Sequence, residues 1–163
     1  MVRTYQFLAV LAFSATLLLP AHARAQDASD TAAVRSVIDR LFDAMRVADT
    51  AAMNALFAGD VELLSVQRRE GSTMVSPTTI DAFLRSVAAA RAQNPDVVLD
   101  ERIGRTTIEI DGDLASAWTE YELWVNDNFS HCGANLFTMA RLEGEWRILR
   151  IADSRRREGC DRD

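Results

Sequence analysis

The sequence changes pattern at Pro95, and this change limits the folds that the chain can adopt. Beyond Pro95, apolar and polar residues alternate in runs that are separated by three turn signals, Asp111-Gly112, Asn126-Asp127-Asn128 and Glu143-Gly144. Alternation of this kind, bounded by Asp, Asn and Gly, is typical of strands joined by tight turns. The C-terminal part is therefore expected to form four strands in an antiparallel meander.

The N-terminal part of the chain has the spacing of helices instead. Apolar residues recur from Val34 to Met45 with the period of an amphipathic helix, which Ser29 or Asp30 can cap. Asp49 is placed to cap a short second helix, and Gly59 closes it. We therefore expect two helices before the first strand.

One strand and a third helix complete the pattern. Residues 61–66 are expected to form a short strand, and the polar segment 67–75 a loop. Ser76-Pro77 is a strong helix start, because a capping hydroxyl precedes a proline in the first turn, and Asn94-Pro95 ends that helix. The expected fold class is therefore α+β, with a sheet packed on three N-terminal helices.

The first 25 residues have the features of a secretory signal peptide. Arg3 gives a positive start, residues 7–19 are almost wholly apolar, and Ala23-Arg24-Ala25 fits a cleavage site between small residues. The apolar run is too short to cross a bilayer, so no membrane anchor is expected. We therefore predict a single domain of residues 26–163 in a periplasmic or secreted protein.

The composition argues against several classes of function. Two of the 18 basic residues lie in the signal peptide and none of the 24 acidic ones does, so the domain has a net charge of 16 − 24 = −8. Nucleic acid is an unsuitable partner, because its binding depends on Lys and Arg. The chain has no Lys for a Schiff base, and residues 26–163 contain one histidine, His131. Neither a cofactor nor a metal site is expected.

Pairing the strands about their turns assigns side chains to the two faces of the sheet. The expected pairs are Ile108 with Ala115, Thr106 with Ala117, Tyr121 with Gly133, Leu123 with His131, Met139 with Ile148, Phe137 with Arg150 and Asn135 with Ala152. Because side chains alternate between faces, the face under the helices collects Ile108, Ile110, Ala115, Ala117, Thr119, Tyr121, Phe137, Met139 and Ile148. The outer face collects Trp118, Glu120, Glu122, Trp124, Asp153 and Arg155.

The whole pattern resembles the nuclear-transport-factor-2-like superfamily, and in particular its SnoaL-like members. The resemblance is carried by the helix 34–45, by Leu56-Phe57-Ala58-Gly59-Asp60-Val61, by residues 108–115 and by Gly144-Glu145-Trp146-Arg147-Ile148. It implies a cone, in which a curved mixed or antiparallel sheet wraps against the helices and leaves a pocket at the open end. It also implies a homodimer through the outer face of the sheet, where Trp118, Trp124 and Leu136 form an apolar patch.

His131 and Tyr121 are the candidate catalytic residues. His131 is expected on the inward face, where an imidazole can act as a general acid or base, although it could also be a hydrogen-bonded rim residue with no proton to move. Ketosteroid isomerase, a member of the superfamily, combines a tyrosine with aspartates, and Tyr121 could supply the phenol. The inward face offers no acid partner, however, and Asp43, Asp60 and Glu62 are more readily explained as solvated charges.

The expected ligand-binding residues surround this pair and are Thr119, Asn135, Phe137, Arg150 and Arg156. An inward Arg150 could hold a carboxylate or an enolate with its planar fork, or it could instead pair with a buried acid of the first helix, Asp39 or Asp43. The charges of residues 153–157 resemble an anion site, although such runs are usually solvated.

The same register predicts one cavity. Tyr121 faces Gly133, and the missing side chain leaves room beside the ring, so we expect a mostly apolar cavity that opens near His131 and includes Asn135. Phe42 and Phe83 can form its walls, the latter from the third helix. A one-residue bulge that shifts the fourth strand would move every inward side chain to the outer face.

Cys132 and Cys160 are expected to form a disulfide, because the signal peptide indicates an oxidising compartment. The alternative is a pair of free thiols. A catalytic Cys–His pair is disfavoured, since His131 and Cys132 are adjacent and point to opposite faces of a strand.

Three hypotheses about function follow. The first is an exported SnoaL-like domain that binds a small hydrophobic or aromatic molecule without strong catalysis. The second is a cofactor-independent isomerase, cyclase or dehydratase that acts on an apolar carbonyl compound through His131 and Tyr121. The third is a protein-interaction domain that uses the outer tryptophans. The first is preferred, because the acid partner needed for the second is missing from the inward face.

Overall fold

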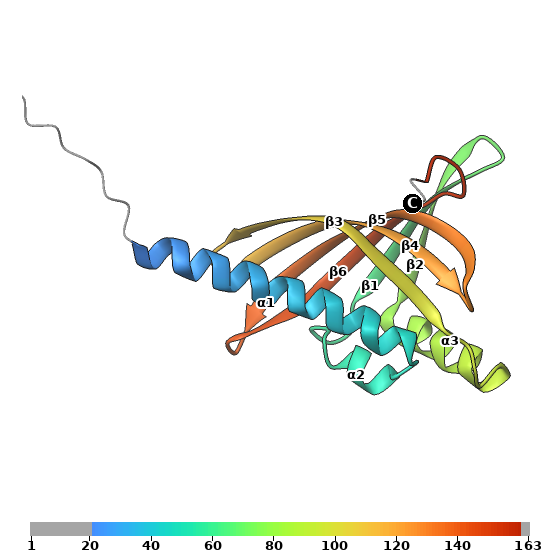
Figure 1. Ribbon diagram of the computed structural model, residues 1–163, viewed down its shortest axis with the longest axis horizontal. Helices are drawn as coiled ribbons and strands as arrows, with labels where there is room; N and C mark the ends of the chain where they lie inside the picture. Colours follow the sequence, from blue (N-terminus) through green and yellow to red (C-terminus); the bar gives the residue numbers. More distant parts are fainter. Residues whose placement is uncertain (1–20, 161–163) are drawn as a thin grey trace, which may run out of the picture.

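The computed structural model describes residues 21–160, which form three helices and one six-stranded sheet (Figure 1). In chain order the elements are α1 (Ala21–Arg46), α2 (Thr50–Asn54), β1 (Glu62–Arg69), β2 (Ser72–Thr79), α3 (Ile80–Gln93), β3 (Leu99–Asp111), β4 (Leu114–Val125), β5 (Asn128–Leu142) and β6 (Glu145–Arg155). The strands lie in the order β2-β1-β6-β5-β4-β3; β1 and β6 are parallel, and all other neighbours are antiparallel. The α+β class with a mixed sheet is therefore confirmed.

The sheet curves over α1, and the core lies between them (Figure 1). The apolar stripe predicted for this helix is buried, and Ile38 at its centre is fully so. It packs on the inward residues of the sheet, among which Phe137 and Met139 are also fully buried. The rings of Phe42 and Phe137 meet edge to face with centroids 6.1 Å apart. Removing this apolar surface from water is the main favourable contribution to folding.

The first helix starts earlier than predicted. Ser29 and Asp30, the expected caps, lie inside α1, which extends beyond them toward the N-terminus. Asp30 is buried and forms an ion pair of 2.6 Å with Arg141 of β5, so its carboxylate serves the contact between helix and sheet. The cap of α2 is as predicted, because the Asp49 carboxylate accepts a 3.0 Å hydrogen bond from the backbone N–H of Ala52.

The segment predicted as a loop and a helix start is instead a β-hairpin. Its strands β1 and β2 are joined by Glu70 and Gly71, whose φ values of 50° and 82° are typical of a tight hairpin turn. Pro77 fits because β2 is an edge strand, where a missing N–H need not break the ladder. The third helix therefore begins after Thr79, whose hydroxyl accepts from Ala82 N, and the predicted start at Ser76 is wrong.

The predicted meander of β3 to β6 is present. Its central hairpin has the predicted register, with Tyr121 opposite Gly133 and Leu123 opposite His131. The first hairpin turns at residues 112–113, one residue later than expected, so its register is shifted by two. A shift of two residues leaves every side chain on its predicted face.

The last hairpin contains a bulge that changes the face of its side chains. Met139 pairs with Ile148 as predicted, but Thr138 pairs with Arg150, which leaves Leu149 as an extra residue in β6. Because the side-chain period of a strand is two, the residues of β6 beyond the bulge point to the face opposite the predicted one. Arg150 is therefore on the outer face, and the pairing predicted for it is wrong.

The predicted disulfide is present. Cys132 and Cys160 are bonded, with Cα atoms 6.0 Å apart. The bond holds the segment after β6 against β5, where the backbones of Cys132 and Arg156 also exchange two hydrogen bonds of 2.9 Å.

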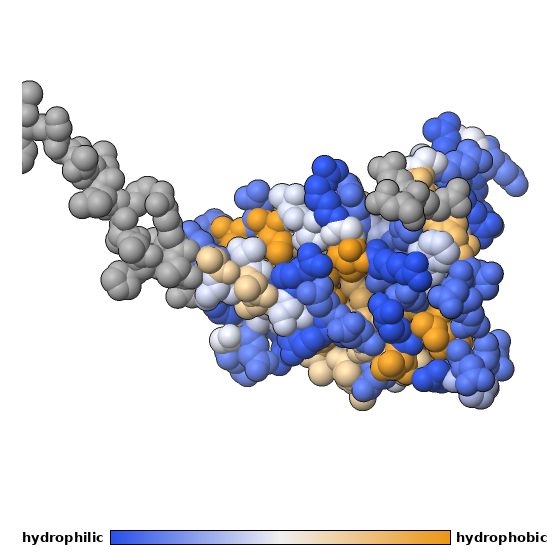
Figure 2. Space-filling model, viewed as in Figure 1, coloured by the Kyte–Doolittle hydropathy of each residue, from blue (hydrophilic) through white to orange (hydrophobic). Residues whose placement is uncertain are grey.

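Residues 1–20 of the predicted signal peptide lie outside the described residues. Among residues 21–160, no helix has the length and apolar character needed to cross a membrane. The face of the molecule in Figure 2 is mostly hydrophilic, and its apolar side chains form small separate groups.

Candidate functional site

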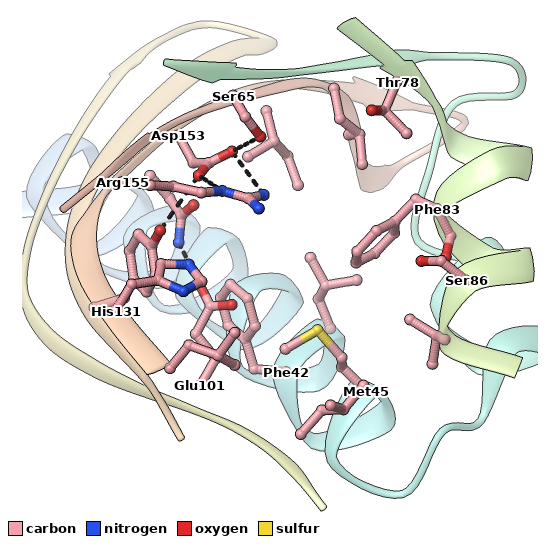
Figure 3. Close-up of a pocket in the computed structure, with 18 of the residues that line it drawn as sticks. Phe42, Met45, Ser65, Thr78, Phe83, Ser86, Glu101, His131, Asp153 and Arg155 are labelled. Carbon is pink, nitrogen blue, oxygen red and sulfur yellow. Dashed lines mark hydrogen bonds and ion pairs between the residues drawn. The ribbon is translucent and has the colours of Figure 1, made fainter. Parts of the chain in front are cut away.

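A cavity of about 330 Å³ lies between the concave face of the sheet and the helices α1 and α3. All six strands and these two helices contribute to its wall (Figure 3). The lining residues are Leu41, Phe42, Met45, Leu63, Ser65, Thr78, Phe83, Ser86, Val87, Ala90, Leu99, Glu101, Tyr121, Leu123, His131, Asn135, Ile151, Asp153 and Arg155.

The cavity is mostly apolar on its helix side and carries most of its polar groups on its sheet side, among apolar strand residues. The helices present Phe42, Met45 and Phe83; in Figure 3, Phe83 lies across the cavity from Asp153 and Arg155, whereas Phe42 lies beside Glu101. The sheet presents the polar groups together, including Asp153 and Arg155. An apolar enclosure with convergent polar groups on one side is the usual form of a small-molecule site.

Glu101 on β3 is the acidic group that sequence reasoning missed. Its Oε1 accepts a 2.7 Å hydrogen bond from Nδ2 of Asn135 on β5. Burial raises the pKa of Glu101 to about 8; the hydrogen bond from Asn135 opposes this shift and the nearby charge of Asp153 adds to it. At neutral pH the Glu101 carboxyl is therefore mainly protonated.

Asp153 is the centre of a second group of polar side chains. Its Oδ1 accepts from Ser65 Oγ at 2.6 Å, and its Oδ2 accepts from Tyr121 Oη at 3.3 Å. Arg155 donates to both oxygens, from Nε at 2.5 Å and from Nη2 at 3.3 Å. The Asp153 side chain is only 11% exposed, so the ion pair with Arg155 compensates a charge that has largely left water.

Tyr121 is buried and has its hydroxyl committed within the protein. It donates to the backbone carbonyl of Ser154 at 3.0 Å and lies near Asp153. Burial, the charge of Asp153 and that of Glu101 raise the pKa of the Tyr121 phenol above its usual value. Tyr121 therefore stays a neutral phenol and fixes the end of β6 to the sheet.

His131 stands beside Tyr121 in the cavity wall. The two rings meet edge to face with centroids 5.7 Å apart, and Nδ1 of His131 is 3.0 Å from Ser130 Oγ. Burial lowers the pKa of His131, and the positive charges of Arg155 and Arg157 lower it further while Asp153 opposes them. The imidazole is therefore neutral at neutral pH.

The predicted cavity is present, and several of its predicted wall residues line it. Tyr121, His131 and Asn135 lie in the wall on the sheet side, and Phe42 and Phe83 lie on the helix side. The space predicted beside the Tyr121 ring is different: the Ser154 carbonyl fills the position opposite it.

Four of the residues expected to bind ligand do not line this cavity. Thr119 and Phe137 are fully buried in the core, where the Thr119 hydroxyl is 2.7 Å from Thr106 Oγ1. Arg150 lies on the outer face, and its Nη2 is 3.8 Å from Glu62. Arg156 lies with Cys132 and Gly133 in a different, more open depression.

The expectation that the inward face lacks an acid is wrong. The acids considered as partners of Tyr121 do not line the cavity; these are Asp43, Asp60 and Glu62. Glu101 and Asp153 do line it. Arg155 also points inward, although simple alternation placed it on the outer face with Asp153. The inward arginine of β6 is thus Arg155 and not Arg150.

Two bulges explain these corrections. In β3, Ile103 pairs with Tyr121 and Thr106 with Thr119, so that Gly104 and Arg105 face one residue of β4. Counting back from Ile108 without the bulge places Glu101 outside, whereas the extra residue turns it inward. Gly104 inside a strand was the available signal, because an isolated glycine there often marks a bulge.

The cavity wall combines several groups that titrate or donate hydrogen bonds. A neutral carboxyl with a pKa of about 8, a neutral imidazole and a guanidinium share one enclosed wall. Among residues 21–160, no three His, Cys, Asp or Glu side chains are grouped so that they could hold a metal ion. Groups that titrate near neutrality can act in acid–base steps as well as in recognition.

Comparison with known proteins identifies a family. A family model described as "Putative lumazine-binding" matches residues 29–151, which is most of the chain. A search of curated proteins finds no match.

Solved structures show the same fold. An NTF2-like protein with a cystatin-like fold from Novosphingobium aromaticivorans is 21% identical, with a TM-score of 0.61 over 86% of this chain and 90% of that one. A "putative dehydratase from the NTF2-like family" from Streptomyces avermitilis is 14% identical, with a TM-score of 0.60 over 80% and 98%. The beta subunit of a "putative aromatic-ring-hydroxylating dioxygenase" from N. aromaticivorans is 19% identical, with a TM-score of 0.63 over 81% and 91%. The resemblance to the nuclear-transport-factor-2-like superfamily is confirmed at the level of the fold.

Proposed function

The chain belongs to the family described as "Putative lumazine-binding", and from this premise we propose that the protein binds a small molecule in the cavity between its sheet and its helices. The observation that supports the proposal most directly is the division of the cavity into a mostly apolar helix side and a sheet side that carries most of the polar groups (Figure 3). Its volume of about 330 Å³ lies within the range of small-molecule sites.

The charged groups in the cavity wall largely compensate one another. Asp153 and Arg155 neutralise each other, and Glu101 carries no charge at neutral pH because its pKa is about 8. The wall thus offers polar atoms for hydrogen bonding at little net charge. A small hydrophobic or aromatic molecule with a polar end fits such a wall.

The proposal can be tested by filling the cavity from α3. Ala90 lines the cavity, whereas Ala89 of the same helix is exposed and does not. A fragment set is screened by ligand-observed NMR. We expect fragments that bind the wild type and Ala89→Trp and that compete with one another for a single site. Their binding should be lost in Ala90→Trp. Hits that bind Ala90→Trp equally well would place the site elsewhere and contradict the proposal.

A second candidate function is proton transfer on a bound carbonyl compound, as in an isomerase or lyase. It is favoured by Glu101, since an acid–base catalyst is most effective when its pKa is close to the working pH. His131 is the second group that could move a proton. The expected observation is deuterium incorporation from D₂O into a cavity ligand next to its carbonyl, which Glu101→Gln abolishes and Ala89→Trp does not.

We also propose that the protein is exported and forms a homodimer through the outer face of the sheet. Export is supported by the disulfide between Cys132 and Cys160 and by the N-terminal sequence. Dimerisation is supported by Trp118 and Leu136, which are directly paired on β4 and β5 and are 52% and 39% exposed. N-terminal sequencing of the exported protein should give Gln26 as its first residue, and an intact Met1 would contradict export by this route.

A further inference from the structure

Three polar atoms on β3, β5 and β6 in the sheet wall of the cavity can donate hydrogen bonds and have no partner among residues 21–160. They are Oε2 of Glu101, Nε2 of His131 and Nη1 of Arg155. In Figure 3 the Arg155 guanidinium extends from the sheet wall into the cavity, and Glu101 and His131 lie on the same side. These atoms are not sealed from the cavity, so a ligand that accepts hydrogen bonds can pair with them.

At neutral pH these atoms can all be donors. Asn135 donates to Oε1 of Glu101, which therefore acts as the carbonyl oxygen, and the acid proton is on Oε2. Arg155 has only donors. When Nδ1 of His131 accepts from Ser130 Oγ, the proton of the neutral ring is on Nε2, which becomes a third donor.

The acceptors in the same wall are only partly occupied, because Oδ1 of Asn135 has no hydrogen-bond partner in the described part of the chain, residues 21–160. Asp153 accepts from Ser65 and from two nitrogens of Arg155, so that both of its oxygens are used. Tyr121 gives its own proton to the Ser154 carbonyl. A ligand group that only donates hydrogen bonds, such as an ammonium, would thus find fewer free partners in this wall than a group that only accepts them.

We infer that the natural ligand is an apolar molecule that ends in a carboxylate, and that Arg155, protonated Glu101 and His131 hold the carboxylate against the sheet wall. The inference rests on the small-molecule function proposed above and gives it a ligand class. Two carboxylate oxygens have enough lone pairs for three donors, and the guanidinium is a charged donor, although Asp153 already compensates its charge. The apolar part would lie against the helix wall.

Binding of such a ligand depends on the protonation of Glu101. The titratable and charged groups that face it are Asp153 and Arg155 of β6, Tyr121 of β4 and His131 of β5, whereas the lining residues of α1 and α3 are not titratable. Ionised Glu101 would place a second negative charge beside the ligand carboxylate. The affinity should therefore fall above about pH 8, approaching ten-fold for each pH unit.

Three probes that differ only in the polar end test the ligand class. They are 2-naphthoate, the neutral 2-naphthalenemethanol and the cationic 2-naphthylmethylammonium, measured by titration calorimetry at pH 7. We expect 2-naphthoate to bind at least about ten-fold more tightly than the alcohol, as a charged hydrogen bond implies, and the ammonium to bind weakest. An alcohol or ammonium that binds as tightly as the carboxylate overturns the ligand class but leaves the small-molecule function standing.

Failure of all three probes to bind also overturns the inference, and the comparison of Ala90→Trp with Ala89→Trp then decides the small-molecule function separately. Arg155→Gln should weaken 2-naphthoate about ten- to a hundred-fold and change the alcohol little. Arg150→Gln is the matched control, because Arg150 lies on the outer face of the same strand. An equal loss in both variants, or for both probes, contradicts direct binding by Arg155.

Glu101→Gln tests the role of the carboxyl proton. The amide can donate a hydrogen bond from the position of Oε2 but cannot ionise. The fall in 2-naphthoate affinity above about pH 8 should therefore disappear in this variant. A pH dependence equal to that of the wild type would show that Glu101 is not the group responsible.

Discussion

The side chain of Asn135 on β5 reaches across β4 and donates a 2.7 Å hydrogen bond to Oε1 of Glu101 on β3. This contact orients a carboxyl whose pKa burial has raised to about 8. It also leaves the second oxygen of Glu101 directed to the cavity. The polarity of the whole sheet wall therefore depends on a group that changes charge near neutral pH.

The first prediction is that the free energy of unfolding falls between about pH 4.5 and 8 because of Glu101. Its pKa is about 8 in the folded protein and close to 4.5 in the unfolded chain, so over this range the folded state holds a proton that the unfolded state has lost. The stabilising effect is complete below pH 4.5 and is lost as the pH rises to 8. It amounts to a few kcal/mol, since each pKa unit corresponds to about 1.4 kcal/mol.

Urea unfolding at several pH values measures this effect. Glu101→Gln removes the titrating group, so its stability relative to the wild type should rise with pH. Glu109→Gln is the control, because Glu109 is exposed on the same strand. A constant difference between Glu101→Gln and the wild type from pH 5 to pH 8.5 would contradict the prediction.

The second prediction concerns Gly133, which faces Tyr121 across β4 and β5. A Cβ atom at Gly133 would lie 1.7 Å from the backbone oxygen of Ser154 and 2.9 Å from the Tyr121 ring. The Ser154 carbonyl cannot move without losing its hydrogen bond from Tyr121. We expect Gly133→Ala to destabilise the protein by about 3 kcal/mol or more, at the upper end of the cost of overpacking.

Gly104→Ala is the matched substitution for this experiment. The same added carbon at Gly104 would meet its nearest atom, Glu120 Cβ, at 3.3 Å, which a small shift of that side chain relieves. Both variants are compared with the wild type in urea unfolding. If Gly133→Ala were as stable as the wild type, β5 and β6 would be less closely apposed than the structure indicates.

Much of the fold could be predicted because it depends on local patterns. The apolar stripe of α1, the cap at Asp49 and the turns of the meander all act through neighbouring residues, and they are present. The β1–β2 hairpin was missed because its turn, Glu70-Gly71, is not one of the common turn pairs and because Pro77 suggested a helix. Pro77 is tolerated only since β2 is the edge of the sheet, which is a tertiary property.

The sequence predicted the inward site residues that are placed by regular strand pairing, but not those that lie beyond a β-bulge. His131 and Asn135 lie on β5, and their positions depend only on the pairing of β4 with β5. The bulge of β6 does not affect them, so their inward positions followed from one hairpin. Glu101 and Arg155 lie beyond bulges in β3 and β6, where alternation gives the wrong face. A bulge arises from how neighbouring strands pack and bend, and a single extra residue has little signature in the sequence apart from Gly104.

The third prediction is that Trp118→Glu converts a dimer into a monomer. Trp118 and Leu136 form the exposed apolar pair on the outer face, and a charge at their centre would be buried without a partner in the proposed interface. Sedimentation velocity should show the loss of the larger species. Val47→Glu is the control, because Val47 is equally exposed but follows α1 rather than lying on the sheet. A wild-type protein that sediments as a monomer at every concentration contradicts the dimer itself.

The fourth prediction concerns the disulfide that holds the end of the chain beside the cavity. Cys132 and Cys160 are 28 residues apart, and closing a loop of this length contributes roughly 3 to 4 kcal/mol in the chain-entropy model. The double variant Cys132→Ala/Cys160→Ala should lose about that much stability, and the wild type in strong reductant should lose the same amount. Unchanged stability in both would show that the bond adds nothing to the fold.

The loss should also be visible at one place in the backbone. The amides of Cys132 and Arg156 bond to each other's carbonyls at 2.9 Å, next to Arg155 in the cavity wall. Without the disulfide this short ladder loses the covalent link beside it, so both amides should exchange with solvent faster in hydrogen-exchange NMR. The amide of Met139, in the centre of β5, is the internal control. Met139 should accelerate only as far as the loss of global stability requires, and equal acceleration at all three amides would mean that the bond has no local effect on the segment that positions Arg155.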